Sequence, residues 1–354
     1  MRSELTYYLQ MHTLVLTLLI RLWSVVVLNS YSALDMSYQY AYEKQVEMRR
    51  NPYQYVYNIY ERNTATEVKF VWNDTAFRPL TYHLKQNMMW NHRSICTNST
   101  FVLLMYFTCH HELERRNLIR QYVKQGMVID GMTINYVMIV ASSNNDTNTL
   151  NELKRENNEF NDLLVSMHED NYRHWPITVL DAYMWARDNC REASYVVKID
   201  GDTWVHYGNL VHCLLDAPRE KFYGGHLYSE YFRGGQKYKR IQFHPSDFQG
   251  KWIDFNWGSC TAISRDVIPF VNIGTQFMDY IWPGCEDSLI SEILRKGGIY
   301  PFGKMKNYHW MLFHNRVNST SIPNNTVSVH TGNKKQLLMD LYKEHSTIIT
   351  PLTA

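Results

Sequence analysis

The sequence lacks an excess of charge of either sign. Among its 354 residues, 36 Lys and Arg stand against 34 Asp and Glu, and the formal net charge is +2. Nucleic-acid-binding domains usually carry a pronounced basic patch or stripe, and a charge this balanced gives no electrostatic footprint of that kind. We therefore expect no nucleic-acid partner.

The sequence also lacks a Cys-x-x-Cys pair, the usual signature of a structural zinc site, which argues against such a site. An even number of cysteines suits disulfide bonds in an oxidising compartment, although the sequence alone leaves their pairing open. Five Asn-x-Ser/Thr sequons, together with an apolar N-terminal segment, favour the secretory route. The cysteines are Cys96, Cys109, Cys190, Cys213, Cys260 and Cys285, and the sequon asparagines are Asn73, Asn98, Asn145, Asn318 and Asn324.

An uninterrupted apolar run long enough to span a membrane is missing as well. Residues 14–28 form an apolar block that Arg21 interrupts, and the block reaches the ~20 residues of a spanning helix only when extended back to Leu5. A mid-membrane arginine costs about 2.5–3.5 kcal/mol, which so many Leu and Val residues tolerate. We favour a signal anchor within residues 1–30. The alternatives are a signal peptide cleaved near Ser32-Ala33 and a buried core helix.

The remainder of the chain divides into a stem and a folded domain. Residues 31–92 are rich in Tyr, Asn and Arg with little periodicity, which is typical of a stem. Within residues 93–354, apolar strand-type runs at 101–107, 134–140 and 195–199 alternate with helical patterns at 113–123, 150–164 and 177–187. This order predicts a single α/β domain with a mainly parallel central sheet flanked by helices.

Three further segments carry weaker local predictions. Residues 222–226 predict a short strand and a glycine turn, and residues 228–251 predict a long surface loop that is polar, basic and aromatic. Residues 257–264 predict a tight turn that leads into a strand.

The segment Asp200-Gly201-Asp202 carries the first chemical signal. It follows a predicted buried strand, so two carboxylates lie at a sheet edge, where they can hold Mg²⁺ or Mn²⁺ and leave positions open for substrate phosphates. Asp-Gly-Asp is also ordinary turn chemistry, which is the better interpretation without context. Ligands of parallel sheets bind beyond the carboxyl ends of the strands, and this placement raises the motif above a plain turn. No second carboxylate cluster accompanies it, which argues against a two-metal hydrolase.

Two later features can complete such a site. Glu286 and Asp287 begin an amphipathic helix predicted over residues 284–296, where acidic side chains suit the helix dipole; the alternative is a general base at a pocket rim. His330 ends a late strand that can return to the sheet edge, with His309 and His314 as rivals. Imidazole binds Mn²⁺ better than Mg²⁺, so a histidine ligand would favour manganese.

The order of these motifs resembles that of the β-1,3-galactosyltransferase and β-1,3-N-acetylglucosaminyltransferase family, which is related to the fringe glycosyltransferases. The similarity covers about residues 101–338. Residues 114–120 resemble the family's RRxxIRxTW segment, with Gln121-Tyr122 in place of Thr-Trp. Residues 198–202 resemble K-x-D-D-D with Gly201 as the middle residue, and residues 285–287 resemble the start of the EDV helix. Val329-His330 matches a late V-H, residues 257–265 loosely match a CSGxGYVLS turn, and Thr178 replaces a usual lysine.

The resemblance implies an inverting, GT-A type glycosyltransferase that moves galactose or N-acetylglucosamine from a UDP-sugar to an acceptor glycan on a glycoprotein or glycolipid, in β-1,3 linkage. It implies a single-pass type II protein of the Golgi membrane, with residues 93–354 as a luminal catalytic domain. The alternative is a catalytically inactive relative that binds a glycan or a partner protein. The departures at Gly201, Thr178, residues 121–122 and around Cys260 motivate that alternative.

Site roles follow from the same resemblance, position by position. Asp202 and His330 correspond to direct Mn²⁺ ligands, Asp200 to support for the metal or the ribose, and Asp287 to the catalytic base. The positions that correspond to the nucleotide site are Arg115, Arg116, Arg120 and Lys198. Arginine suits phosphate through its bidentate donors, although structural ion pairs are an equally good interpretation of these arginines.

Overall fold

The computed structural model describes residues 67–71, 79–83, 88–90, 95–142, 146–172, 174–232, 237–238, 241–242, 251–274, 284–303, 305, 307–315, 317 and 319–345. All of them belong to a compact unit formed by residues 61–354. The predicted anchor, most of the predicted stem and the sequons at Asn73, Asn145 and Asn318 lie outside the described residues. Within the described ranges, no helix is both long enough and apolar enough to cross a membrane.

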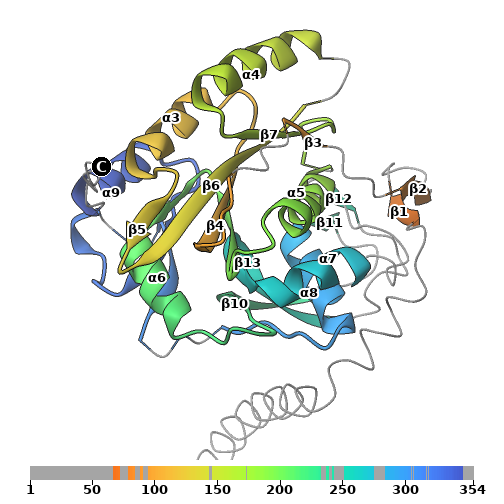
Figure 1. The fold of residues 1–354 in the computed structure, drawn as a ribbon. Coiled ribbons are helices and arrows are strands. Elements are labelled where there is room, and N and C mark those ends of the chain that lie inside the picture. The colour runs from red at the N-terminus through yellow and green to blue at the C-terminus, as the bar shows by residue number, and fades with distance from the viewer. Residues whose placement is uncertain are drawn as a thin grey trace, which may run out of the picture. The chain divides into compact units, whose positions relative to one another are not determined.

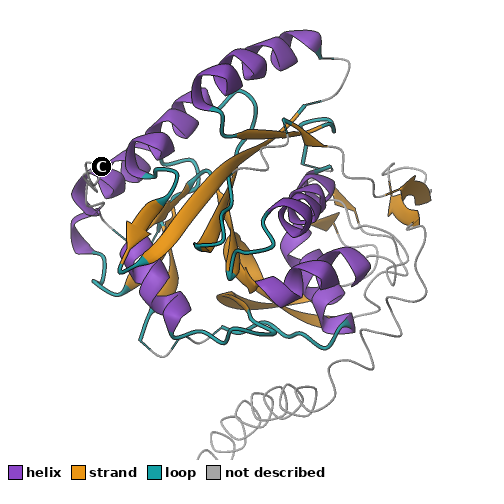
Figure 2. Cartoon of the chain, viewed as in Figure 1, coloured by secondary structure: helices purple, strands orange, loops and turns teal. Residues whose placement is uncertain are grey.

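An eight-stranded sheet forms the centre of this unit (Figures 1 and 2). The strand order is β10-β13-β8-β4-β6-β7-β3, with β5 paired to β6. The four middle strands β8, β4, β6 and β7 run parallel, and the outer pairings are antiparallel. The strands are β3 (Met88–Met89), β4 (Thr100–Phe107), β5 (Met127–Ile129), β6 (Met132–Ala141), β7 (Leu163–Ser166), β8 (Tyr195–Asp200), β10 (Tyr223–Phe232) and β13 (Lys251–Ser264). The predicted α/β fold with a parallel sheet centre is confirmed.

Helices cover both faces of the sheet. All eight residues of β4 are buried, and from Val102 to Phe107 they alternate between two hydrophobic clusters because successive strand side chains point to opposite faces. One cluster includes side chains from α3 (Leu113–Tyr122), α4 (Thr147–Phe160), α6 (Tyr207–Leu215) and α9 (Lys335–His345). The other includes α5 (Trp175–Asn189), α7 (Ile268–Gly274) and α8 (Glu286–Lys296), which Figure 1 shows together beside the sheet.

Smaller elements complete the described part of the chain. A three-stranded sheet has the order β14-β15-β9 and consists of β14 (His309–Phe313), β15 (Thr326–His330) and β9 (Thr203–Val205). Two further strand pairs are β1 (Glu67–Val71) with β2 (Pro79–His83), and β11 (Lys237–Tyr238) with β12 (Ile241–Gln242). Short 3-10 turns occupy η1 (Arg265–Val267) and η3 (Ser319–Ser321). In the three-stranded sheet, His330 pairs with Thr203, directly after the Asp-Gly-Asp turn.

Several predicted boundaries were wrong. The helix predicted over 150–164 ends at Phe160, because Asn161 adopts a left-handed conformation (φ 51°) and caps it; Leu163 and Leu164 then begin β7. Residues 222–226 hold no glycine turn and residues 257–264 no tight turn, since β10 and β13 run through both segments as long antiparallel partners. Met88 and Met89, within the predicted stem, pair with β7 and extend the sheet.

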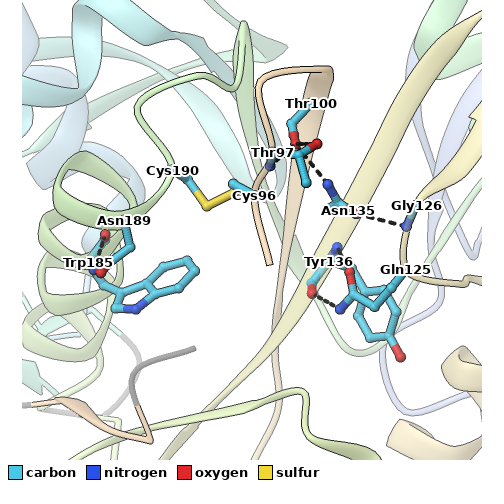
Figure 3. The surroundings of a disulfide bond; sticks show 10 residues. All are labelled: Cys96, Thr97, Thr100, Gln125, Gly126, Asn135, Tyr136, Trp185, Asn189 and Cys190. Carbon is cyan, nitrogen blue, oxygen red and sulfur yellow. Dashed lines mark hydrogen bonds between the residues drawn. A yellow bond between two sulfur atoms is a disulfide. The ribbon is translucent and has the colours of Figure 1, made fainter. Parts of the chain in front are cut away.

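One disulfide bond joins Cys96, ahead of β4, to Cys190 at the end of α5 (Figure 3). Beside it, Thr100 Oγ1 accepts hydrogen bonds from the Thr97 backbone N–H (2.9 Å) and from Asn135 Nδ2 (2.8 Å), which fixes the start of β4. The other four cysteines are free; three are buried, and Cys109 is partly exposed. The bond agrees with the oxidising compartment that the sequence suggests.

Candidate active site

A cavity of about 450 Å³ lies at the carboxyl ends of the parallel strands β4 and β8. It is where ligands of parallel α/β sheets bind. The cavity wall brings together five of the residues that the sequence analysis singled out, although they come from four separate parts of the chain. These residues are Arg115, Asp200, Asp202, Asp287 and His330.

The end of β8 and the end of β15 form one corner of this cavity. His330 Nε2 lies 3.4 Å from Asp202 Oδ2. The Asp202 backbone carbonyl accepts hydrogen bonds from the Thr331 backbone N–H (2.9 Å) and hydroxyl (2.6 Å), which ties the two strand ends together. Asp202 Oδ1 is buried and has no hydrogen-bond partner among the described residues. Buried carboxylate oxygens rarely lack a partner, so this one, beside an imidazole, is suited to ligate a divalent cation.

Gly201 is tightly enclosed at the centre of the motif. Its backbone N–H donates to the Phe107 carbonyl (2.8 Å). A Cβ atom built on Gly201 would lie 2.6 Å from Thr108 Cγ2 and 3.1 Å from Arg115 Cδ, so these side chains fill the space that a middle aspartate would need. Both outer carboxylates, those of Asp200 and Asp202, line the cavity.

The buried side chain of Lys198 contacts Asp200, the first carboxylate of the Asp-Gly-Asp turn. Its ammonium group lies 2.6 Å from Asp200 Oδ1, donates to the Gly258 carbonyl (2.6 Å) and lies 3.4 Å from Glu286 Oε1. Burial alone would lower the pKa of Lys198, but Asp200 and then Glu286 raise it above its usual value. Burial raises the pKa of Asp200 to about 6; Lys198 opposes this rise, and Glu286 and Asp202 add to it.

The position of Lys198 corrects its predicted role. Only 2% of the residue is exposed, and it is not among the described residues that line the cavity. Lys198 therefore orients Asp200 and Glu286 rather than contacting a nucleotide. Glu286, to which no supporting role for Lys198 was assigned from the sequence, is the second carboxylate of this buried arrangement.

Arg116 and Arg120 are also turned away from the cavity. Arg116 forms a bidentate ion pair with Glu156 (2.8 and 2.7 Å), and Arg120 pairs with Asp162 (2.9 and 2.8 Å) and Glu156 (2.6 Å). Both arginines are buried, so they join α3 to α4 and to Asp162, which precedes β7. Of the two interpretations of these arginines, the structural ion pair is the one observed, and their predicted place in the nucleotide site is corrected accordingly. Successive helix residues point in different directions, and Arg115 alone of the three faces the cavity.

Asp287 lines the cavity from the first turn of α8. The helix begins after Cys285, which makes no side-chain capping bond, and Asp287 Oδ1 accepts from the next backbone N–H, of Ser288 (2.7 Å). Close approach of β13 sets this position, because a Cβ on Gly258 would lie 2.7 Å from Glu286 Oε1 and 3.3 Å from Asp287 Cβ. The carboxylate is thus held at the cavity by a rigid helix start, where the dipole also favours its charge.

The cavity also contains residues that the sequence analysis did not assign to the site. These include Asp170, Cys109 and Glu112, to which no role was assigned from the sequence. The rival histidines His309 and His314 are not among the described cavity residues; the His314 ring lies 6.4 Å from the His330 ring. The remaining lining includes the aromatic side chains of Phe107, Tyr172, Trp175 and Trp257.

Comparison with known proteins places the chain in a family. The galactosyltransferase family model matches residues 114–302, just over half of the chain. The β-1,3-galactosyltransferase 1 of Mus musculus is 24% identical over 260 residues, which cover 70% of this chain and 76% of that protein. The lactosylceramide 1,3-N-acetyl-β-D-glucosaminyltransferase of Xenopus tropicalis is 25% identical over 227 residues, which cover 60% of this chain and 58% of that protein.

Among solved structures, the mannosyltransferase PcManGT from Pyrobaculum calidifontis matches with a TM-score of 0.34 and 15% identity, over 67% of this chain and 58% of that one. A match of this quality adds nothing to the assignment, which rests on the sequence comparisons. The matched residues include Arg115, the Asp200-Gly201-Asp202 turn and Asp287, so the family match spans most of the cavity wall. The chain belongs to the galactosyltransferase family.

Proposed function

We propose that this protein is an inverting, GT-A type glycosyltransferase, which transfers galactose or N-acetylglucosamine from a UDP-sugar to an acceptor glycan in β-1,3 linkage. Membership of the galactosyltransferase family supports glycosyl transfer to a glycan. The observation that carries the proposal is the single cavity in which the Asp200–Asp202 turn, His330 and Asp287 meet. Two named relatives transfer different sugars, so both donors are retained in the proposal.

The donor would bind at the strand-end corner. Asp202 and His330, supported by Asp200, offer two carboxylates and an imidazole, a ligand set that suits Mn²⁺. When bound, the ion would supply positive charge against the leaving diphosphate. Arg115 adds a fixed positive charge to the same wall, where its guanidinium is held by Glu112. These residues bind and orient the diphosphate end of the donor.

The acceptor would enter from the side of α8. Glu286 and Asp287 both line that wall, but Glu286 is buried beside Lys198 whereas Asp287 is partly exposed, and we assign Asp287 as the general base. It takes the proton of the attacking hydroxyl, whose oxygen then approaches the anomeric carbon from the face opposite UDP. The aromatic rings of Trp257 and Tyr172 line the space between, where they can stack on a sugar ring.

Purified full-length protein tests this assignment with two substitutions. Asp287→Asn should lower transfer by about 10²–10⁴-fold, the usual contribution of a general base, and leave UDP binding in Mn²⁺ nearly intact. Asp202→Asn should abolish both. Glu114→Gln is the matched control, because the Glu114 side chain is 81% exposed and pairs with Lys335 at the surface. Undiminished transfer in either site variant would disprove the assignment.

The same measurement decides between the enzyme and the alternative of an inactive, glycan- or partner-binding relative. An inactive relative predicts no Mn²⁺-dependent UDP binding, whereas the packing around Gly201 leaves both outer carboxylates available for it. A screen of UDP-sugar hydrolysis and transfer across several donors would identify the sugar.

The proposal includes a Golgi location, with residues 1–30 as membrane anchor and the catalytic domain in the lumen. The disulfide bond and the sequons support a secretory route. Asn98 and Asn324, the two sequon asparagines in the described part of the chain, are both exposed and therefore accessible to glycosylation. Protein from secretory cells should lose apparent mass on endoglycosidase treatment, and Asn98→Gln should reduce that loss; an unchanged mass would contradict the location.

A further inference from the structure

A second group of metal-binding side chains lies at the rim of the same cavity. Cys109 and His111 follow β4, and Asp170 follows β7, so the parallel sheet brings both loops to one edge. One ligand atom from each residue, a sulfur, an imidazole nitrogen and a carboxylate oxygen, lies within 4.8 Å of the other two. Cys109 and Asp170 line the cavity, and His111 is exposed at its rim. None of the three belongs to the Asp-Gly-Asp corner.

Neighbouring residues hold this group in place. Asp170 Oδ2 accepts hydrogen bonds from the His110 backbone N–H (2.9 Å) and from His110 Nδ1 (2.8 Å). Among the described residues, the bonds to this carboxylate all fall on Oδ2, so Oδ1 is available to a metal. A metal-binding carboxylate that is oriented by an outer hydrogen bond in this way is a common feature of built metal sites.

The buried Arg116 fixes the loop that carries the other two ligands. Its guanidinium donates to the carbonyl oxygens of Cys109 (2.7 Å) and His110 (3.0 Å), and the Cys109 backbone N–H donates to Glu112 Oε2 (3.0 Å). Because Arg116 is itself held by Glu156, the loop cannot rearrange without losing its hydrogen bonds to a fixed, buried guanidinium. The ion pair between α3 and α4 therefore also fixes the loop that carries Cys109 and His111.

We propose that Cys109, His111 and Asp170 form a zinc site at the rim of the donor cavity. Thiolate, imidazole and carboxylate are the three ligand types that zinc takes from proteins, and three protein ligands leave a fourth position open. On binding, Zn²⁺ forms a bond to sulfur and the thiol proton passes to solvent. The thiolate and the carboxylate then balance the charge of the ion. Two of the three ligands line the cavity, so an ion that they hold would lie at its wall.

The consequence concerns the proposed function and rests on it. A zinc ion on this wall shares the cavity with the diphosphate of the donor and offers it a second, competing cation. We expect Zn²⁺ to inhibit sugar transfer in the presence of saturating Mn²⁺, with Cys109→Ser requiring a higher Zn²⁺ concentration for the same inhibition.

Cobalt binding to the full-length protein tests the site without reference to activity. Co²⁺ should produce a sulfur-to-cobalt charge-transfer absorption, which Zn²⁺ removes on titration. Cys109→Ser should abolish this band. His111→Ala should weaken Zn²⁺ affinity by at least about 10-fold, since the loss of even an outer partner of a ligand costs ~10–100-fold. His212→Ala, which removes an exposed histidine paired with Asp130, should leave the band unchanged.

The failures of the two proposals are distinguishable. Asp202→Asn should keep the cobalt–sulfur band while losing Mn²⁺-dependent UDP binding, because the two ligand sets share no residue. Absence of the band in the wild-type protein, or its persistence in Cys109→Ser, would overturn the zinc site and leave the proposed transferase untouched. A band that Asp202→Asn also removes would likewise overturn it, because cobalt binding to sulfur would then depend on a residue outside the proposed ligand set.

Discussion

Substitution of Lys198 by methionine is the sharpest test of the buried support beneath the cavity. The change keeps most of the volume of the side chain and removes one positive charge from between two carboxylates. Asp200 lies 2.6 Å and Glu286 lies 3.4 Å from the ammonium nitrogen. At an effective dielectric constant of about 20, these distances correspond to gross attractions of roughly 6 and 5 kcal/mol. The cost of removing the lysine from water offsets much of this.

The net change in unfolding free energy therefore depends on the buried groups that lose their partner in the variant. Lys198→Met leaves two neighbouring carboxylates with no cation between them, and the Gly258 carbonyl loses its donor. Breaking a buried ion pair from one side costs about 3–5 kcal/mol, which we expect as the loss of unfolding free energy at neutral pH. Burial already raises the pKa of Asp200 to about 6 in the wild type, where Lys198 opposes the rise. Without Lys198, this pKa should rise further. Binding of Mn²⁺ should weaken in parallel.

Urea unfolding of the wild type, Lys198→Met and Lys335→Met measures the effect. Lys335 pairs with Glu114 where both side chains are mostly exposed, so its loss should change stability by no more than about 1 kcal/mol. The double variant Lys198→Met/Glu286→Gln should recover part of the loss, since it leaves one buried carboxylate instead of two. Equal destabilisation by Lys198→Met and Lys335→Met would refute the electrostatic role of Lys198.

Three further outcomes follow from other parts of the structure. Gly201→Asp should lower stability by about 1–3 kcal/mol in urea unfolding and reduce transfer, because its Cβ would collide with Thr108 and Arg115; a more active variant would contradict this packing. Arg120→Met should cost about 3–5 kcal/mol by leaving the buried Asp162 without its cation, whereas Arg187→Met, in an exposed pair, should cost no more than about 1 kcal/mol. His206 caps α6 by accepting the Asn209 N–H (3.0 Å), and burial lowers its pKa. As the pH falls through about 6.5, His206 therefore takes up a proton in the unfolded chain before it does so in the folded protein, and the free energy of unfolding should fall between about pH 7.5 and pH 5.5. His206→Asn caps the helix without titrating and should flatten this pH dependence. An unaltered pH dependence would count against the cap.

The cavity corner was predictable because it depends on rules that act along the chain. A β-branched run predicts the strand that ends at Asp200, and the carboxyl ends of parallel strands are where ligands bind. The late strand ending at His330 and the acidic start of α8 have equally local signals. Each of these residues lies in the cavity because an element boundary, rather than a detail of packing, puts it there.

Side-chain direction was not predictable in the same way. Arg115, Arg116 and Arg120 share one helical segment, and which of them faces the cavity depends on how α3 rotates against Glu156 of α4 and Asp162. The end of α4 is set by the left-handed backbone of Asn161. Asparagine adopts this conformation only occasionally, so its presence in the sequence does not by itself mark the end of a helix. The proposed zinc ligands show the same limit: the sequence contains no close cysteine pair, and Asp170 joins Cys109 and His111 only through the sheet.

The Cys96–Cys190 bond makes a closed ring of the chain from the start of β4 to the end of α5. The ring spans a sequence separation of 94 residues and contains half of the central sheet, including the loops of the proposed zinc site. By chain-entropy reasoning, closure of a ring of this size stabilises the fold by about 4–5 kcal/mol. The free energy of unfolding therefore differs between the disulfide-bonded and the reduced chain, and the redox potential of the compartment decides which form is present. Material made in a reducing cytosol is an open-chain form that should unfold more readily than the disulfide-bonded form, although the two have the same sequence.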